Sequence, residues 1–190
     1  MKTIIFDIDG TLTDLWPIER SVLISMLGRQ SSIQINKLKS SGTSNLYAIF
    51  NKCSPEKIDK STFTQKYNNT FTVLLKENRL PSPKKYPLVK WIKNNARKYT
   101  YVYATGGQKA ETLYVLSKLE IVQFFDIQNS VDKTTCRYSK KTGLPFRKIL
   151  QKYPQAILIT DSESDREGAA KFAIPTLIVS ENTTTLDANI

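Results

Sequence analysis

Residues 4–14 read IIFDIDGTLTD, and this stretch decides the fold because an apolar run ends abruptly in carboxylates. Ile4 to Phe6 favour burial, whereas Asp7 and Asp9 need water, a metal ion or a hydrogen-bond donor. A buried strand that ends in a polar turn would explain the pattern by itself. A functional site at the strand end would explain it equally well, and other parts of the chain then have to supply the remaining residues of that site.

Apolar runs and helical patterns alternate along the chain, which is typical of a parallel sheet covered on both faces. We expect strands at residues 4–6, 99–104, 156–159 and 175–179. Apolar residues at helical spacing predict helices at residues 108–119, 145–153 and 164–172. The predicted fold class is therefore α/β, with a Rossmann-like parallel sheet at its core.

Residues 15–87 break this alternation, because no buried strand is evident among them. Apolar residues recur at three- and four-residue spacing within 18–28, 44–53 and 63–80. We therefore predict a small α-helical cap domain at residues 15–87, inserted after the first strand of a core domain formed by residues 1–14 and 88–190. Trp16, Tyr47 and Phe50 could line a pocket in this cap, although helical spacing favours the cap core for Tyr47 and Phe50.

The formal net charge of +11 over 190 residues favours anionic partners such as phosphate esters. Nucleic acid is a possible but not a favoured partner, because the lysines are spread out and no nucleic-acid-binding motif is present. No apolar run is long enough to cross a bilayer or to form a signal peptide, so no membrane partner is expected. Cys53 and Cys136 lack metal-ligand spacing, which predicts free thiols and a cytoplasmic location. The oligomeric state stays open.

Three apolar runs end in short polar clusters, at residues 7–11, 105–107 and 161–165. The carboxyl ends of parallel strands lie together, so we expect these clusters to converge on one ligand site. Converging carboxylates would repel one another without a hard cation, and Mg²⁺ accepts carboxylates, water and phosphate oxygens as ligands. Gly106 and Gly107 let backbone N–H groups approach an anion. The combination favours phosphoryl transfer through an aspartyl phosphate.

The motifs DIDGT, ATGG and DSESD, in this order, resemble those of the haloacid dehalogenase superfamily of phosphohydrolases. The helical insertion resembles the type-one cap of its phosphoglycolate phosphatase-like members. The resemblance implies that Asp7 is the nucleophile and Asp9 the general acid and base. It also implies phosphate binding by Thr105 and the Gly106 amide. The Mg²⁺ ligands would be Asp7, the Asp9 backbone carbonyl and Asp161, with Asp165 steadying the water shell of the metal.

The superfamily also uses a lysine between its second and last motifs to neutralise the phosphate and the nucleophile. Its usual lysine–proline signature is missing here, and the segment YSKKTGLPF at residues 138–146 offers both Lys140 and Lys141, with Lys133 further back. We choose Lys141 as the phosphate-binding lysine, because it is nearest the turn before Pro145.

These residues predict a Mg²⁺-dependent phosphomonoesterase that acts on a small phosphorylated metabolite. Asp9 argues against the dehalogenases, which lack an aspartate there, and against the ion-pumping ATPases, which carry a threonine. A phosphomutase is disfavoured because similar mutases use a cap histidine and this chain has no histidine. A Schiff-base phosphonatase would need a cap lysine, and Lys37, Lys39 and Lys52 leave it open. A nucleotide or nucleic-acid phosphatase and a non-catalytic binding protein also stay open.

Overall fold

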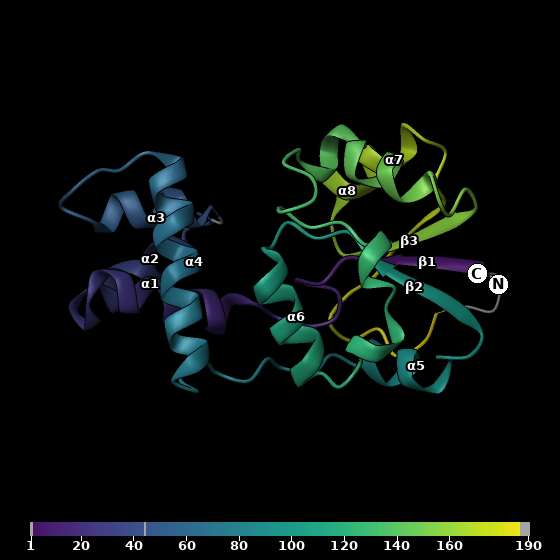
Figure 1. The fold of residues 1–190 in the computed structure, drawn as a ribbon. Helices are drawn as coiled ribbons and strands as arrows, with labels where there is room; N and C mark the ends of the chain where they lie inside the picture. Colours follow the sequence, from purple (N-terminus) through teal and green to yellow (C-terminus); the bar gives the residue numbers. More distant parts are fainter. Residues whose placement is uncertain (1, 44, 187–190) are drawn as a thin grey trace. The chain divides into compact units, whose positions relative to one another are not determined.

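The computed structural model describes residues 2–43 and 45–186, and the chain divides into two compact units (Figure 1). The core unit comprises Met1–Asp14 and Pro83–Ile190, and the helical unit comprises Leu15–Ser82. The assignment of residues 15–87 as a cap domain stays a prediction. The ends of the predicted core domain, residues 1 and 187–190, lie outside the described residues.

The core unit contains a parallel sheet in the order β2-β1-β3-β4, so the predicted α/β fold class is confirmed. Its strands among the described residues are β1 (Lys2–Phe6), β2 (Tyr99–Tyr103), β3 (Ala156–Thr160) and β4 (Thr176–Ile178). The register aligns Phe6 with Tyr103 on one side and with Ile159 on the other. Parallel pairing therefore brings the carboxyl ends of the three longer strands to one edge of the sheet.

Helices cover both faces of this sheet, with α5 and α6 on one face and α7 and α8 on the other (Figure 1). Their bounds are α5 (Leu88–Asn94), α6 (Lys109–Lys118), α7 (Leu144–Leu150) and α8 (Glu163–Ala170). Successive strand residues point to opposite faces. Ile5 and Leu158 thus pack with Phe146, while Phe6 and Tyr101 meet edge to face with ring centroids 5.8 Å apart. Burial on both faces explains the continuous apolar strand sequences.

Each predicted strand and helix of the core unit is present, with ends that shift by at most three residues. Pro175 lies just before β4, and its carbonyl accepts a hydrogen bond from the Leu158 N–H. Helix α5 is present but was not predicted from the sequence, because seven residues after a proline-rich segment give too short a periodic pattern. The connections contain single turns of 3₁₀-helix: η2 (Val122–Phe124), η3 (Ile127–Asn129) and η4 (Lys140–Thr142).

The helical unit is built from α1 (Trp16–Leu27), η1 (Arg29–Ser31), α2 (Ser32–Ser40), α3 (Leu46–Cys53) and α4 (Lys60–Lys76). Asp59 caps α4, since its carboxylate accepts hydrogen bonds from the Ser61 and Thr62 N–H groups. The predicted helix at residues 44–53 begins with Ser44, which lies outside the described residues. Within the described ranges, none of the helices is long and apolar enough to cross a membrane.

An aromatic cluster forms the core of the helical unit. The Phe63 ring lies 5.4 Å from the Phe50 ring and 5.8 Å from the Tyr47 ring, measured between centroids. The Tyr47 hydroxyl donates a hydrogen bond to the Ile58 carbonyl. Tyr47 and Phe50 therefore stabilise the packing of α3 against α4 and against the segment that precedes α4.

Candidate active site

Asp7 is a buried carboxylate at the carboxyl end of β1. Its N–H donates to the Ile159 carbonyl at 2.9 Å, which continues the pairing of β1 with β3 by one residue. Its Oδ1 accepts a hydrogen bond from the Ile8 N–H at 2.8 Å. The side chain is only 8% exposed, so the charge needs a nearby cation to offset the loss of hydration. The structure provides one.

That cation is the Lys140 ammonium, which lies between two buried carboxylates. Lys140 Nζ is 2.6 Å from Asp7 Oδ1, and it also pairs with Asp165 Oδ2. The three side chains come from the end of β1, from η4 and from the first turn of α8. The one ammonium is shared by two carboxylates, so removal of Lys140 would leave two buried negative charges without a counter-charge.

Together, burial and these charges raise the pKa values of both Asp165 and Lys140. Burial raises the pKa of the Asp165 carboxyl to about 6, and the Asp7 charge acts in the same direction while Lys140 opposes it. Burial alone would lower the pKa of the Lys140 ammonium, but the charges of Asp7 and Asp165 more than offset it and raise that pKa. Lys140 is therefore protonated at neutral pH.

The end of β3 supplies a hydroxyl and a further carboxylate. The Thr160 hydroxyl lies 3.1 Å from Asp165 Oδ2 and 3.5 Å from Asp7 Oδ2, because the register sets Thr160 beside Asp7. The next residue, Asp161, receives a hydrogen bond from the Thr11 hydroxyl and donates its own N–H to the same oxygen. Partial burial and then the charge of Asp7 raise the pKa of the Asp161 carboxyl. Two hydrogen bonds thus connect the turn after β1 to the end of β3.

Gly10 is required in that turn for two reasons. Its φ of +76° lies in the left-handed region, which side chains other than glycine rarely adopt. A Cβ at Gly10 would also lie 2.1 Å from Asp161 Oδ2. The preceding residue, Asp9, is exposed and forms an isolated bridge with Thr13. Asp9 therefore stands at the solvent side of the turn, two residues after the buried Asp7.

The loop after β2 carries the predicted phosphate-binding residues. Ala104 N–H donates to the Phe6 carbonyl, so the β2 end lies beside the β1 end and Thr105 follows directly. The Thr105 hydroxyl accepts a hydrogen bond from the Gly107 N–H at 3.1 Å. Apart from Gly106 and its two chain neighbours, no atom of the described residues lies within 4 Å of the position that a Cβ of Gly106 would take. The exposed Gly106 thus leaves room for an anion against the backbone.

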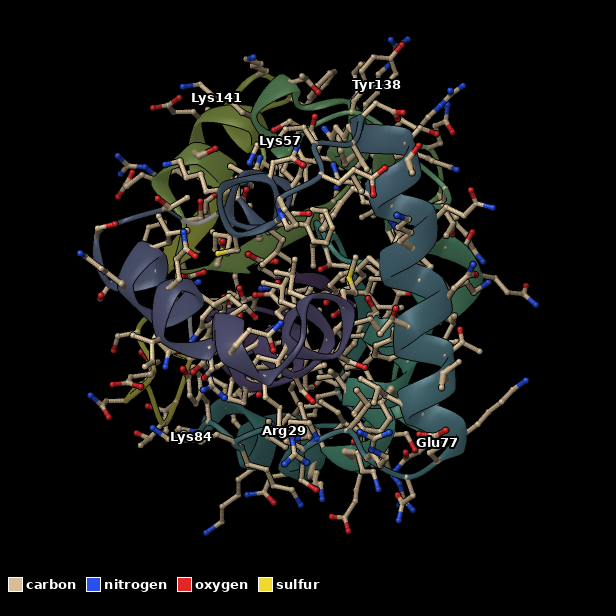
Figure 2. All side chains as sticks on the ribbon, turned by 90° about the vertical axis from the view of Figure 1, so that its left-hand side faces the viewer. Arg29, Lys57, Glu77, Lys84, Tyr138 and Lys141 are labelled. Carbon is tan, nitrogen blue, oxygen red and sulfur yellow. The ribbon has the colours of Figure 1, made fainter. Side chains whose placement is uncertain are left out.

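Lys141 is not brought to these residues. Its side chain is 64% exposed and pairs with Glu167 at 3.1 Å, at the outer surface of the core unit (Figure 2). The Lys133 N–H donates a hydrogen bond to the Gly107 carbonyl in the loop after β2, and its ammonium lies 3.4 Å from the Tyr138 carbonyl. The structure thus places the ammonium of Lys140 beside Asp7, whereas the expected Lys141 pairs with Glu167.

Thr160 and Thr11 were not among the predicted site residues, although Thr160 directly precedes one of the polar clusters at the strand ends and Thr11 ends another. Their hydroxyls orient Asp165 and Asp161. The signal that could have found them is this position, with Thr160 directly before Asp161 and Thr11 two residues after Asp9. A residue that adjoins a ligand at a strand end is well placed to hold it.

The oxygen donors at this edge of the sheet suit Mg²⁺, and they do not form a site in which side chains alone would bind a metal ion. Among the described residues, no three acidic, histidine or cysteine side chains cluster closely enough to hold a metal by themselves. Mg²⁺ usually takes only one or two carboxylates, with water and phosphate oxygens at its other positions. Asp7 and Asp161 provide two carboxylates at this edge, and the charge of Asp7 adds to burial in raising the pKa of Asp161.

Comparisons with known proteins agree with this architecture. The profile of the haloacid dehalogenase-like hydrolase family matches residues 4–179. Among curated proteins, none matches the chain by sequence. Among solved structures, a HAD hydrolase of family IA, variant 3, from Entamoeba histolytica is similar with a TM-score of 0.69 and 15% identity, over 95% of this chain and 85% of that one.

Two further solved structures were obtained with bound ligands. CbbY from Rhodobacter sphaeroides, in complex with phosphate, has a TM-score of 0.67 and 15% identity, over 99% of this chain and 91% of that one. YfnB from Bacillus subtilis, bound to magnesium, has a TM-score of 0.60 and 17% identity, over 92% and 86%. At such identities the likeness shows the fold alone, while the profile covers most of the sequence. This chain therefore belongs to the haloacid dehalogenase-like hydrolase family.

Proposed function

We propose that this hydrolase is a Mg²⁺-dependent phosphomonoesterase that acts on a small phosphorylated metabolite through an aspartyl phosphate on Asp7. The observation that carries the proposal is the Lys140 ammonium held between the buried carboxylates of Asp7 and Asp165. The cation lies beside the proposed nucleophile and can also neutralise an approaching phosphoryl group. The phosphate bound to CbbY and the magnesium bound to YfnB, both of similar fold, support the proposed ligands.

In the first proposed step, a carboxylate oxygen of Asp7 attacks phosphorus while the bond from phosphorus to the ester oxygen breaks. Asp9 gives its proton to the leaving oxygen. In the second step the Asp9 carboxylate takes a proton from water, and the water oxygen attacks phosphorus. The bond between phosphorus and Asp7 then breaks, which releases phosphate and restores the Asp7 carboxylate. We assign this proton transfer to a carboxylate because the chain lacks histidine, the side chain that most often performs it.

Asp7, the Asp9 backbone carbonyl and Asp161 would hold Mg²⁺, and Asp165 would orient its water. When bound, Mg²⁺ would stabilise negative charge on the phosphoryl oxygens. Lys140 supplies a second positive charge at the same edge of the sheet, from its place beside Asp7. Thr105 and the Gly106 amide would bind the remaining phosphoryl oxygens.

We further propose that the helical unit selects the substrate, because Leu15 follows Asp7 by only eight residues in the sequence. A unit inserted so near the nucleophile can contribute residues that exclude water and contact the non-reacting part of the ester. The absence of histidine disfavours a phosphomutase that relies on a cap histidine. The free thiols of Cys53 and Cys136 support a reducing compartment such as the cytoplasm.

Hydrolysis of para-nitrophenyl phosphate tests the proposed activity. We expect turnover in the presence of Mg²⁺, and a loss of about 10²-fold or more on chelation with EDTA, because the metal supplies several kcal/mol of charge stabilisation. Readdition of Mg²⁺ should restore the rate, which controls for damage by the chelator. Metal-independent turnover, or none with this ester and a panel of phosphorylated metabolites, would contradict the proposal. A preference for oligonucleotide phosphates would instead support a nucleic-acid phosphatase.

The substitution Gly10→Ala tests the metal site from the side of the turn. The added Cβ would push the Asp161 carboxylate aside, so the Mg²⁺ concentration for half-maximal turnover should rise by roughly tenfold or more. The left-handed backbone should also lower the free energy of unfolding by about 1–3 kcal/mol. Gly42→Ala is the matched control, because Gly42 also has a positive φ, of +88°, and a Cβ there would meet no described atom within 4 Å outside Gly42 and its two chain neighbours. An equal metal requirement in both variants would contradict the assignment of Asp161.

A further inference from the structure

Lys140 reaches the site from a short turn, η4, whose neighbouring side chain points elsewhere. Lys140 is 15% exposed and pairs with Asp7 and Asp165, whereas Lys141 is 64% exposed and pairs with Glu167. In a 3₁₀ turn consecutive side chains diverge by about a third of a full rotation. Which lysine enters the site therefore depends on how the turn packs against its neighbouring element, which is α8.

Gly168 of α8 is the residue against which the η4 main chain packs. A Cβ at Gly168 would lie 2.0 Å from the Lys140 carbonyl oxygen, 2.9 Å from its carbonyl carbon and 3.2 Å from the Lys141 Cα. These are main-chain atoms, so no side-chain rotation could relieve the overlap. The η4 turn would have to move away from α8. Gly168 thus fixes the main chain of the lysine that contacts Asp7.

The opposite end of the turn also packs closely against α8. Gly143, with a φ of +81°, ends η4, and a Cβ there would lie 2.7 Å from the Gly168 carbonyl oxygen and 2.6 Å from a ring carbon of Phe172. The Lys171 ammonium donates a hydrogen bond to the Lys141 carbonyl at 2.8 Å. The turn is therefore held against α8 at both ends by main-chain contact.

The same helix also carries the carboxylate that Lys140 pairs with. Asp165 precedes Gly168 by three residues, so the two lie on one face of α8. One face of a single helix hence holds both the main chain and the side-chain ammonium of Lys140. A glycine inside a helix costs about 0.5–1 kcal/mol relative to alanine, so the close contact at this position has to outweigh that cost.

We propose that Gly168 is a positioning residue, which sets the Lys140 ammonium between Asp7 and Asp165 by letting η4 approach α8 to main-chain contact. Its effect on turnover rests on the proposed phosphatase function, whereas its effect on the position of Lys140 does not. The two can therefore be measured separately.

Amine acylation of Gly168→Ala measures the position of Lys140 without any activity assay. The folded protein is treated briefly with acetic anhydride, and mass spectrometry locates the modified lysines. In the wild type Lys140 should be protected and the exposed Lys141 reactive, which gives an internal reference. In Gly168→Ala we expect Lys140 to lose its protection while the rate at Lys141 stays the same. Protection that persists in the folded variant would overturn the proposal, whatever the enzyme hydrolyses.

Two other variants keep this test decisive. Glu167→Ala removes only the exposed pair with Lys141, so Lys140 should remain protected. If Gly168→Ala alone does not fold, the exposed Thr142 is also changed to glycine, which lets the turn move off α8. That double variant should fold with Lys140 unprotected, whereas Thr142→Gly alone should leave it protected. A folded double variant with protected Lys140 would overturn the proposal.

A double-mutant comparison then separates positioning from general stability. Gly168→Ala should lower turnover by about 10²-fold, as expected for a small displacement of a group at the reacting centre. In a Lys140→Ala background the same substitution should cause no further loss, because the group that it displaces is gone. Equal losses in both backgrounds would show that Gly168 acts independently of Lys140. If no phosphatase activity is found at all, the acylation result still decides the proposal.

Discussion

Asp7→Asn should lower turnover by at least about 10⁴-fold, which is the scale seen when a catalytic nucleophile is removed. The amide cannot attack phosphorus, yet it has nearly the same size and can still accept the hydrogen bond from the Ile8 N–H. The fold should therefore be retained. Loss of the negative charge also lowers the repulsion on Asp161 and Asp165, whose pKa values the Asp7 charge raises. The melting temperature at neutral pH should consequently be unchanged or slightly higher.

Steady-state kinetics with para-nitrophenyl phosphate and thermal unfolding measure both parts of this prediction. Glu163→Gln is the matched control, because Glu163 also lies within DSESD but is 60% exposed and pairs with Arg166. Its neutralisation should change turnover by less than about twofold, as expected for an exposed pair. Turnover at the wild-type rate in Asp7→Asn would remove Asp7 from the mechanism, even if the other residues of the site proved essential.

The strand ends could be predicted from the sequence because each carries its own local signal. IIFDIDGT, YTYVYATGG and AILITDSESD all change from apolar to polar within one residue. Parallel pairing then brings the ends together without further information, and the register confirms the alignment of Phe6 with Tyr103 and Ile159. The family profile matches residues 4–179, a span that contains all three motifs.

The choice between Lys140 and Lys141 could not be predicted in the same way. The two residues are adjacent and chemically identical, so composition and spacing cannot separate them. Their directions follow from the contact of η4 with Gly168, which is 28 residues further along the chain. Proximity to the turn before Pro145 favoured Lys141, but main-chain packing on α8 turns that side chain toward Glu167. A lysine–proline signature would have marked the position, and this chain lacks it.

Substitution of each lysine by alanine should therefore have very different effects. Lys140→Ala should lower turnover by about 10²- to 10³-fold, the scale for loss of one group that stabilises transition-state charge. Lys141→Ala should stay within about twofold of the wild type, because Lys141 contributes only an exposed ion pair. The comparison is well matched, since both variants lose one ammonium from the same turn. A larger loss in Lys141→Ala than in Lys140→Ala would reverse the assignment.

The two variants should also differ in the pH dependence of their stability, measured by thermal unfolding in EDTA. Without Lys140, the buried carboxylates of Asp7 and Asp165 face each other unpaired, which costs several kcal/mol while both are ionised. Lys140 lowers the pKa of Asp165, so its removal should raise that pKa above about 6. A carboxyl whose pKa is higher in the folded than in the unfolded state destabilises the fold as the pH rises. The loss of stability of Lys140→Ala relative to the wild type should thus be largest near pH 8 and shrink toward pH 5. Lys141→Ala should show no such pH-dependent loss. A deficit that stays constant across this range would show that the lost stability does not come from the unpaired carboxylates.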